Sequence, residues 1–115
     1  MEDTGEGFLN LPAATDGDPT LVWSEVFGDD QPVQIELGIG KGRFILDAAA
    51  RLPEVNFVGV EWAAKYLRIA HHRAGRRQLA NIRFARTDAR EFVEFFVPAA
   101  SVQAYHIYFP DPWPK

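Results

Sequence analysis

Four acidic residues and a glycine-rich loop have the types and spacing that could bind a ligand. The acids are Glu36, Glu61, Asp88 and Asp111, and the loop contains Gly38, Gly40 and Gly42. Glycines suit a chain that turns sharply while a ligand packs against its backbone, because they lack Cβ atoms. The G-x-G-x-G spacing differs from the G-x-G-x-x-G of dinucleotide sites, so it does not favour a phosphate site. A plain tight turn is the alternative explanation.

The acids favour a different kind of ligand. A ligand with a cationic centre and an amino-acid ammonium would take a carboxylate, which Glu36 and Asp111 could supply. Glu61, nineteen residues after Gly42, ends a predicted strand, where an acid pairs with ribose hydroxyls. An exposed strand-end acid is the alternative there. Asp88 precedes a predicted helix, so its side chain could cap that helix, accept from an adenine amino group, or do both.

The segment 108–115 is too rich in proline for the interior of a strand or helix. It reads Y-F-P-D-P-W-P-K. Each proline fixes φ and removes a backbone donor, which predicts a stiff loop that leaves the sheet at the ligand end. Such a loop would hold Asp111 in place, and Trp113 offers a flat face on which a base could stack. A plain strand exit with a packed tryptophan is the alternative.

The elements that must position these residues alternate along the chain. The apolar patterns predict strands at 33–37, 56–61, 81–86 and 103–109, and helices at about 44–52, 64–79 and 89–97, after a short helix at 21–27 that ends at Gly28. Strands that alternate with helices predict an α/β fold, with a parallel sheet covered by helices on both faces. Right-handed crossovers give the strand order 3-2-1-4. The acids and glycines then gather at the carboxyl ends of the strands.

Composition bounds the class of protein. The chain has 115 residues and 47% hydrophobic content, which fits one compact domain. We expect 1–19 to be a flexible leader and 20–115 to form the domain. The absence of cysteine excludes a disulfide framework and a thiolate nucleophile, and the three histidines have no recognisable metal spacing, so no metal is expected. Without a signal peptide or an apolar run of about 18 residues, we expect a cytoplasmic protein that does not enter a membrane.

The charge is unevenly distributed. Nine acids and no lysine or arginine precede residue 37, whereas 65–90 holds eight lysines and arginines against Asp88 alone. A local basic surface of this kind could meet phosphates even in a protein of net charge -4. Solvated helix faces are the alternative.

The motifs together resemble those of the bacterial tRNA (guanine-N7-)-methyltransferase family. They are E-L-G-I-G-K-G at 36–42, N-I-R-F at 81–84, D-A-R at 88–90 and F-P-D-P-W-P-K at 109–115. The resemblance covers about residues 20–115. Class I methyltransferases in general share the glycine loop and the acid after the second strand, whereas the last motif is much narrower.

The resemblance implies a Rossmann-like class I fold and methyl transfer from S-adenosylmethionine to N7 of a guanine in the variable loop of tRNA. By position in the motifs, it implies that Glu36, Glu61, Asp88 and Asp111 contact the cofactor beside the glycine loop. It also implies that Asp111 is the catalytic residue and that Lys115 binds the substrate. Trp113, with its flat face, is expected to join Lys115 in substrate binding. Family members continue well beyond the last motif, so we expect a partial methyltransferase domain.

Other classes of protein would show part of this sequence pattern. Another class I methyltransferase, acting on a different RNA, a protein or a small molecule, would share everything up to Asp88. A non-catalytic module that binds the cofactor or RNA is a second alternative. A dehydrogenase is disfavoured by the spacing of the glycines.

Overall fold

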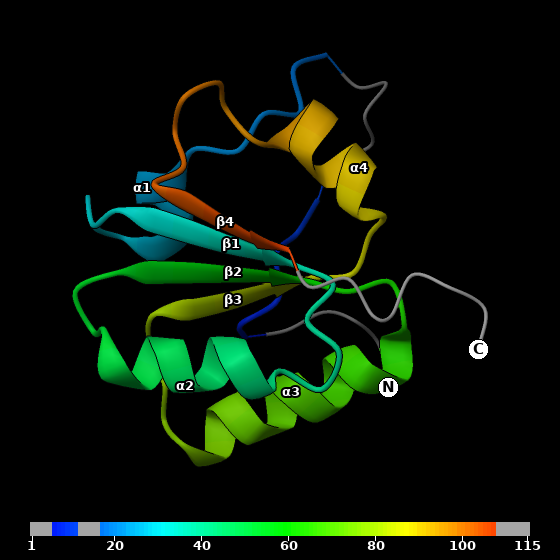
Figure 1. The fold of residues 1–115 in the computed structure, drawn as a ribbon. Helices are drawn as coiled ribbons and strands as arrows, with labels where there is room; N and C mark the ends of the chain where they lie inside the picture. The colour runs from blue at the N-terminus through cyan, green and yellow to red at the C-terminus, as the bar shows by residue number, and fades with distance from the viewer. Residues whose placement is uncertain (1–5, 12–16, 108–115) are drawn as a thin grey trace.

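The fold is a parallel sheet flanked by helices, seen in a computed structural model that describes residues 6–11 and 17–107. The elements are α1 (Trp23–Phe27), β1 (Val33–Leu37), α2 (Arg43–Arg51), β2 (Asn56–Val60), α3 (Ala64–Arg76), β3 (Ile82–Ala85), α4 (Ala89–Glu91), η1 (Phe92–Phe96) and β4 (Ala104–Ile107). All neighbouring strands are parallel, in the order β3-β2-β1-β4 (Figure 1). The predicted sheet and its strand order are therefore confirmed.

Each face of the sheet is covered by its own apolar core. Helices α2 and α3 lie on one side and α4 on the other (Figure 1). The first core joins Ile45 and Leu67 of these two helices to Phe57 and Phe84 of the sheet. The second core joins alternate sheet residues to η1 and to the short helix α1. Strand β2 lies inside the sheet and is buried along its whole length, as expected of a central parallel strand.

Local signals in the sequence explain where several elements end. Gly28 ends α1 in the left-handed region, at φ 79°, and its N–H donates to the Ser24 carbonyl. Pro53 follows shortly after the end of α2, where a proline could not continue the helix. In the described ranges, no helix is long and apolar enough to cross a membrane.

The helix predicted at 89–97 is regular only at its start. Helix α4 covers Ala89–Glu91, and the next five residues form the wider π-type turn η1. Phe92 and Phe96 are both buried, with ring centroids 6.2 Å apart, whereas Phe95 between them is exposed. Both rings belong to the apolar core on this face of the sheet. The prediction of one continuous α-helix was wrong in this respect.

A short segment before α1 extends the sheet beyond β3, which the sequence pattern did not indicate. Leu9 N–H donates to the Phe84 carbonyl at 2.8 Å, and Phe84 N–H donates to the Gly7 carbonyl at 2.7 Å. The ring of Phe8 stacks on His71 of α3, with centroids 4.2 Å apart. These contacts cover the outer edge of β3.

Candidate functional site

The glycine loop leaves β1 and enters α2 through three left-handed residues. The φ angles are 79° at Gly38, 59° at Gly40 and 87° at Gly42, a region that side chains other than glycine rarely adopt. The N–H groups of Gly38 and Ile39 donate to the Val60 carbonyl of the neighbouring strand, at 2.8 and 3.1 Å. The loop is thereby fixed above the carboxyl ends of β1 and β2.

The glycines of this loop meet different surroundings. A Cβ added at Gly42 would lie 2.7 Å from the Cβ of Ala70 in α3, so this glycine allows α3 to approach the loop. A Cβ added at Gly40 would meet nothing within 4 Å. The absence of a side chain at Gly42 is therefore explained by helix packing and not by a ligand. At Gly40 the predicted close approach of a ligand is still compatible with the structure.

Glu36 is the least satisfied acid of the site. The side chain lies near the carboxyl end of β1 and the residue is only 5% exposed. Among the described residues, its Oε1 is a buried side-chain oxygen without a hydrogen-bond partner. Burial, and secondly the charge of Glu61, raises the pKa of Glu36 to about 7. A buried carboxylate without a donor is costly, and a cationic group placed beside it would lower that cost.

Both carboxylate oxygens of Glu61 accept hydrogen bonds from the backbone. Its Oε1 accepts from the Gly40 N–H at 2.7 Å, and its Oε2 accepts from the Ala63 N–H at 3.0 Å. The side chain therefore holds the glycine loop against the start of α3. Each carboxylate oxygen has a second lone pair, so the predicted ribose contact stays compatible with this geometry.

Asp88 caps α4. Its Oδ1 accepts from the Glu91 N–H at 3.0 Å, and the residue is exposed. The capping role that the sequence left open is therefore observed, whereas the adenine contact stays a prediction. The remaining predicted site residues, Asp111, Trp113 and Lys115, lie outside the described residues.

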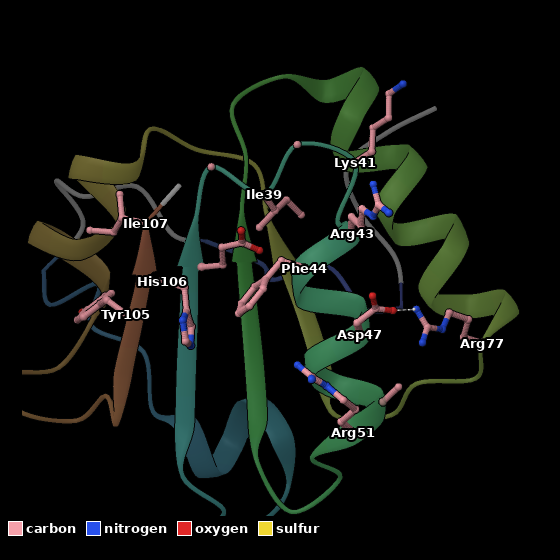
Figure 2. Close-up of a pocket in the computed structure, with 14 residues that line it drawn as sticks. Ile39, Lys41, Arg43, Phe44, Asp47, Arg51, Arg77, Tyr105, His106 and Ile107 are labelled. Atoms are coloured by element: carbon pink, nitrogen blue, oxygen red, sulfur yellow. Dashed lines mark hydrogen bonds and ion pairs between the residues drawn. The ribbon is translucent and has the colours of Figure 1, made fainter. Parts of the chain in front are cut away.

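A groove of about 1030 Å³ begins at Glu36 and the glycine loop and continues along α2 and β4 (Figure 2). His106 and Phe44 line it, and their rings lie 4.9 Å apart. Nε2 of His106 lies 2.8 Å from Oε1 of Gln34. The parallel register sets His106 directly opposite Glu36. Sequence reasoning missed His106 and Phe44, because only the register of two distant strands brings them to this site.

Comparison with known proteins agrees with this architecture. A family model described as a putative methyltransferase matches residues 30–115. The tRNA (guanine-N(7)-)-methyltransferase of Streptococcus suis is 39% identical over 93 residues, which cover 81% of this chain and 43% of that protein. The chain thus spans less than half the length of this relative. The resemblance inferred from the motifs is confirmed.

Solved structures support the fold itself. A 30S ribosomal A1408 methyltransferase from an uncultured bacterium matches with a TM-score of 0.61 and 21% identity, over 76% of this chain and 42% of that one. An RNA methyltransferase from Salinibacter ruber, solved in complex with S-adenosyl-L-homocysteine, matches with a TM-score of 0.57 and 24% identity, over 76% of this chain and 54% of that one. At these identities the likeness shows the fold, and it confirms the predicted Rossmann-like class I methyltransferase architecture.

Proposed function

The chain belongs to the family of putative methyltransferases whose model matches residues 30–115, and from this premise we propose that it is the cofactor-binding part of a tRNA (guanine-N7-)-methyltransferase. The observation that carries the proposal is the buried, unpartnered Oε1 of Glu36 beside the glycine loop. The curated relative named above supports the substrate, because its printed name specifies guanine N7 in tRNA.

The residues present fit S-adenosylmethionine. When bound, this cofactor supplies an electrophilic methyl group on a sulfonium centre. Glu36 would accept from the amino-acid ammonium, and Gly40 would leave space for close approach to the loop backbone. Glu61 would offer its remaining lone pairs to the ribose hydroxyls. Asp88 would offer Oδ2 to the adenine amino group while its Oδ1 caps α4.

Guanine N7 carries an in-plane lone pair, so it can attack the methyl group without a strong base, while the methyl–sulfur bond breaks and S-adenosylhomocysteine leaves. The enzyme then accelerates the reaction mainly by alignment and electrostatic stabilisation. Asp111 is proposed to orient the guanine and to stabilise the positive charge that develops on it. Trp113 and Lys115 are proposed to contact the RNA. Because its proposed substrate is tRNA, we also propose that the protein is cytoplasmic.

The test is to incubate the protein with labelled S-adenosylmethionine and an unmodified tRNA transcript, and then to analyse the nucleosides. We expect the label in 7-methylguanosine, and a matched transcript with 7-deazaguanosine in the variable loop should take up none. Label in any other nucleoside would contradict the guanine-N7 assignment. Cofactor binding without transfer would show a binding module in place of an enzyme.

The role of Asp111 needs a separate measurement. We expect Asp111→Ala to slow single-turnover methylation at saturating cofactor and tRNA. An undiminished single-turnover rate would remove Asp111 from the catalytic centre.

A further inference from the structure

The groove that begins at the glycine loop carries a cluster of basic side chains contributed by two helices. Lys41 lies in the glycine loop just before α2, Arg43 begins α2, and Arg51 ends it. Figure 2 shows them with Arg77, which follows α3, and with Asp47. A second hollow is lined by Arg43, Arg73, Arg76 and Arg77 together with Leu46 and Asp47. The two hollows share Arg43, Asp47 and Arg77, so we treat them as one surface, the α2–α3 basic groove.

The charge balance of this groove is strongly positive. Its six basic residues, Lys41, Arg43, Arg51, Arg73, Arg76 and Arg77, are all exposed. Away from the buried Glu36, the one acid that lines the two hollows within the described part of the chain is Asp47, which pairs with Arg77 at 2.9 Å. The whole protein is acidic, with net charge -4. The positive charge is therefore a local property of this groove, and a polyanion would be attracted to it.

The structure separates this cluster from the rest of the basic stretch at 65–90. The guanidinium of Arg83 lies 4.9 Å from the ring centroid of Phe27 and donates to the Ala80 and Ile82 carbonyls. Nε of Arg90 in α4 lies 3.8 Å from Oε2 of Glu94 in η1. Neither residue lines the basic groove. Two of its members, Arg43 and Arg51, come instead from α2, outside the stretch.

We propose that the α2–α3 basic groove binds the phosphate backbone of the RNA substrate. The proposal rests on the function proposed above, because tRNA is the polyanion that such an enzyme must hold. Arginine suits this role, since its planar guanidinium pairs with two phosphate oxygens at once. The groove is continuous with the space beside Glu36 and Gly40. An RNA strand held along α2 therefore reaches the site from which the methyl group is transferred.

The test compares two double variants that each remove two positive charges. Arg43→Gln/Arg76→Gln lies in the groove. Lys65→Gln/Arg90→Gln, the matched control, changes α3 and α4 outside it. Affinity for tRNA is measured over a range of salt concentrations, with cofactor affinity and thermal melting as controls for folding. Each phosphate contact contributes roughly 0.7–0.9 to the slope of log K against log salt.

We expect the groove variant to flatten this slope by roughly 1.4–1.8, and to weaken tRNA binding roughly 25- to 60-fold at about 0.1 M salt. The control should keep the wild-type slope. Equal slopes for the groove variant and the control would overturn the proposal. A second result would also overturn the proposal. If poly-glutamate bound the wild type but not the groove variant, while both bound tRNA equally, the groove would be a site for an acidic protein partner.

Nucleoside analysis of the same preparations separates this proposal from the proposed function. If the wild type forms 7-methylguanosine while the groove variant keeps the wild-type salt slope, the groove assignment alone fails. If the wild type forms no 7-methylguanosine while the groove variant still flattens the slope, the groove assignment stands and the proposed reaction fails.

Discussion

Glu36 and Glu61 lie near the carboxyl ends of neighbouring strands and carry the same chemical group, but the fold treats them differently. Both carboxylate oxygens of Glu61 accept from backbone N–H groups, at 2.7 and 3.0 Å. The Oε1 of Glu36 is buried without a partner, and the pKa of this side chain is raised to about 7. Glu61 thus belongs to the structure of the loop, whereas Glu36 is held in a state that a cationic ligand would relieve.

The same division runs through the rest of the site. Gly42 and Asp88 serve the fold, the first by admitting α3 and the second by capping α4. Gly40 faces open space and joins Glu36 on the ligand side. Substitutions in the first group should act mainly on stability, and substitutions in the second should also lower affinity for the cofactor.

Gly42→Ala should have the largest effect. The new Cβ would lie 2.7 Å from the Cβ of Ala70, and the alanine would have to adopt the φ of 87° that Gly42 has. Overpacking and the left-handed conformation together should lower the free energy of unfolding by roughly 2–5 kcal/mol, measured by urea unfolding. Gly40→Ala is the matched control, since its Cβ meets nothing within 4 Å and only the left-handed φ of 59° is unfavourable, which should cost roughly 1–2 kcal/mol. Equal losses for the two variants would contradict the role of helix packing at Gly42.

Glu61→Gln should follow. The neutral amide can accept through one oxygen only, so both backbone N–H groups lose a charged acceptor, and that of Gly40 or of Ala63 loses its acceptor altogether. Hydrogen bonds to charged groups contribute about 1.5–3 kcal/mol each, and we expect a loss of that size in the free energy of unfolding. Hydrogen exchange at the Gly40 amide should become faster. An unchanged exchange rate would show that Glu61 does not hold the loop.

Asp88→Ala should cost less, about 1 kcal/mol, because it removes the side-chain acceptor at the start of α4. Asp88→Asn keeps an acceptor oxygen and should keep most of the stability. Comparing the thermal unfolding of the two variants separates loss of the capping hydrogen bond from loss of the negative charge. If both variants lost the same amount, the cap would not be the cause.

The sheet could be predicted from the sequence because its signals are local. The apolar run at 33–37, the glycines after it and the proline at 53 mark a strand, a turn and the end of a helix without reference to distant residues. The handedness of crossovers then fixes the strand order. Acids near strand ends gather at one edge of any parallel sheet, so Glu36 and Glu61 could be assigned to one site in advance.

Features that depend on tertiary contacts were not predictable in this way. The contact between Gly42 and Ala70 depends on the angle at which α3 crosses the loop. The placement of His106 opposite Glu36 depends on the register of β1 with β4. The basic groove joins residues of α2 to residues near the end of α3, so the charge pattern along the chain indicated only part of it.

Glu36→Gln should cause no loss of stability near neutral pH. The pKa is raised by folding, so between about pH 4.5 and 7 the folded protein retains a proton that the unfolded chain has lost. The wild type therefore loses stability relative to Glu36→Gln as the pH rises through this range. Urea unfolding at pH 5 and pH 8 measures this difference, and a difference of the opposite sign would contradict the buried state of Glu36.

Cofactor binding tests the central claim most directly, namely that Glu36 is reserved for the ammonium of S-adenosylmethionine. Near pH 6 a ligand-free Glu36 with a pKa of about 7 is mostly protonated, and binding of the ammonium should expel that proton. Calorimetric titration at pH 6, in two buffers of different ionisation enthalpy, should show release of nearly one proton by the wild type. Glu36→Gln should bind roughly 10- to 100-fold more weakly and release none. Equal affinity and equal proton release for the two proteins would contradict the account.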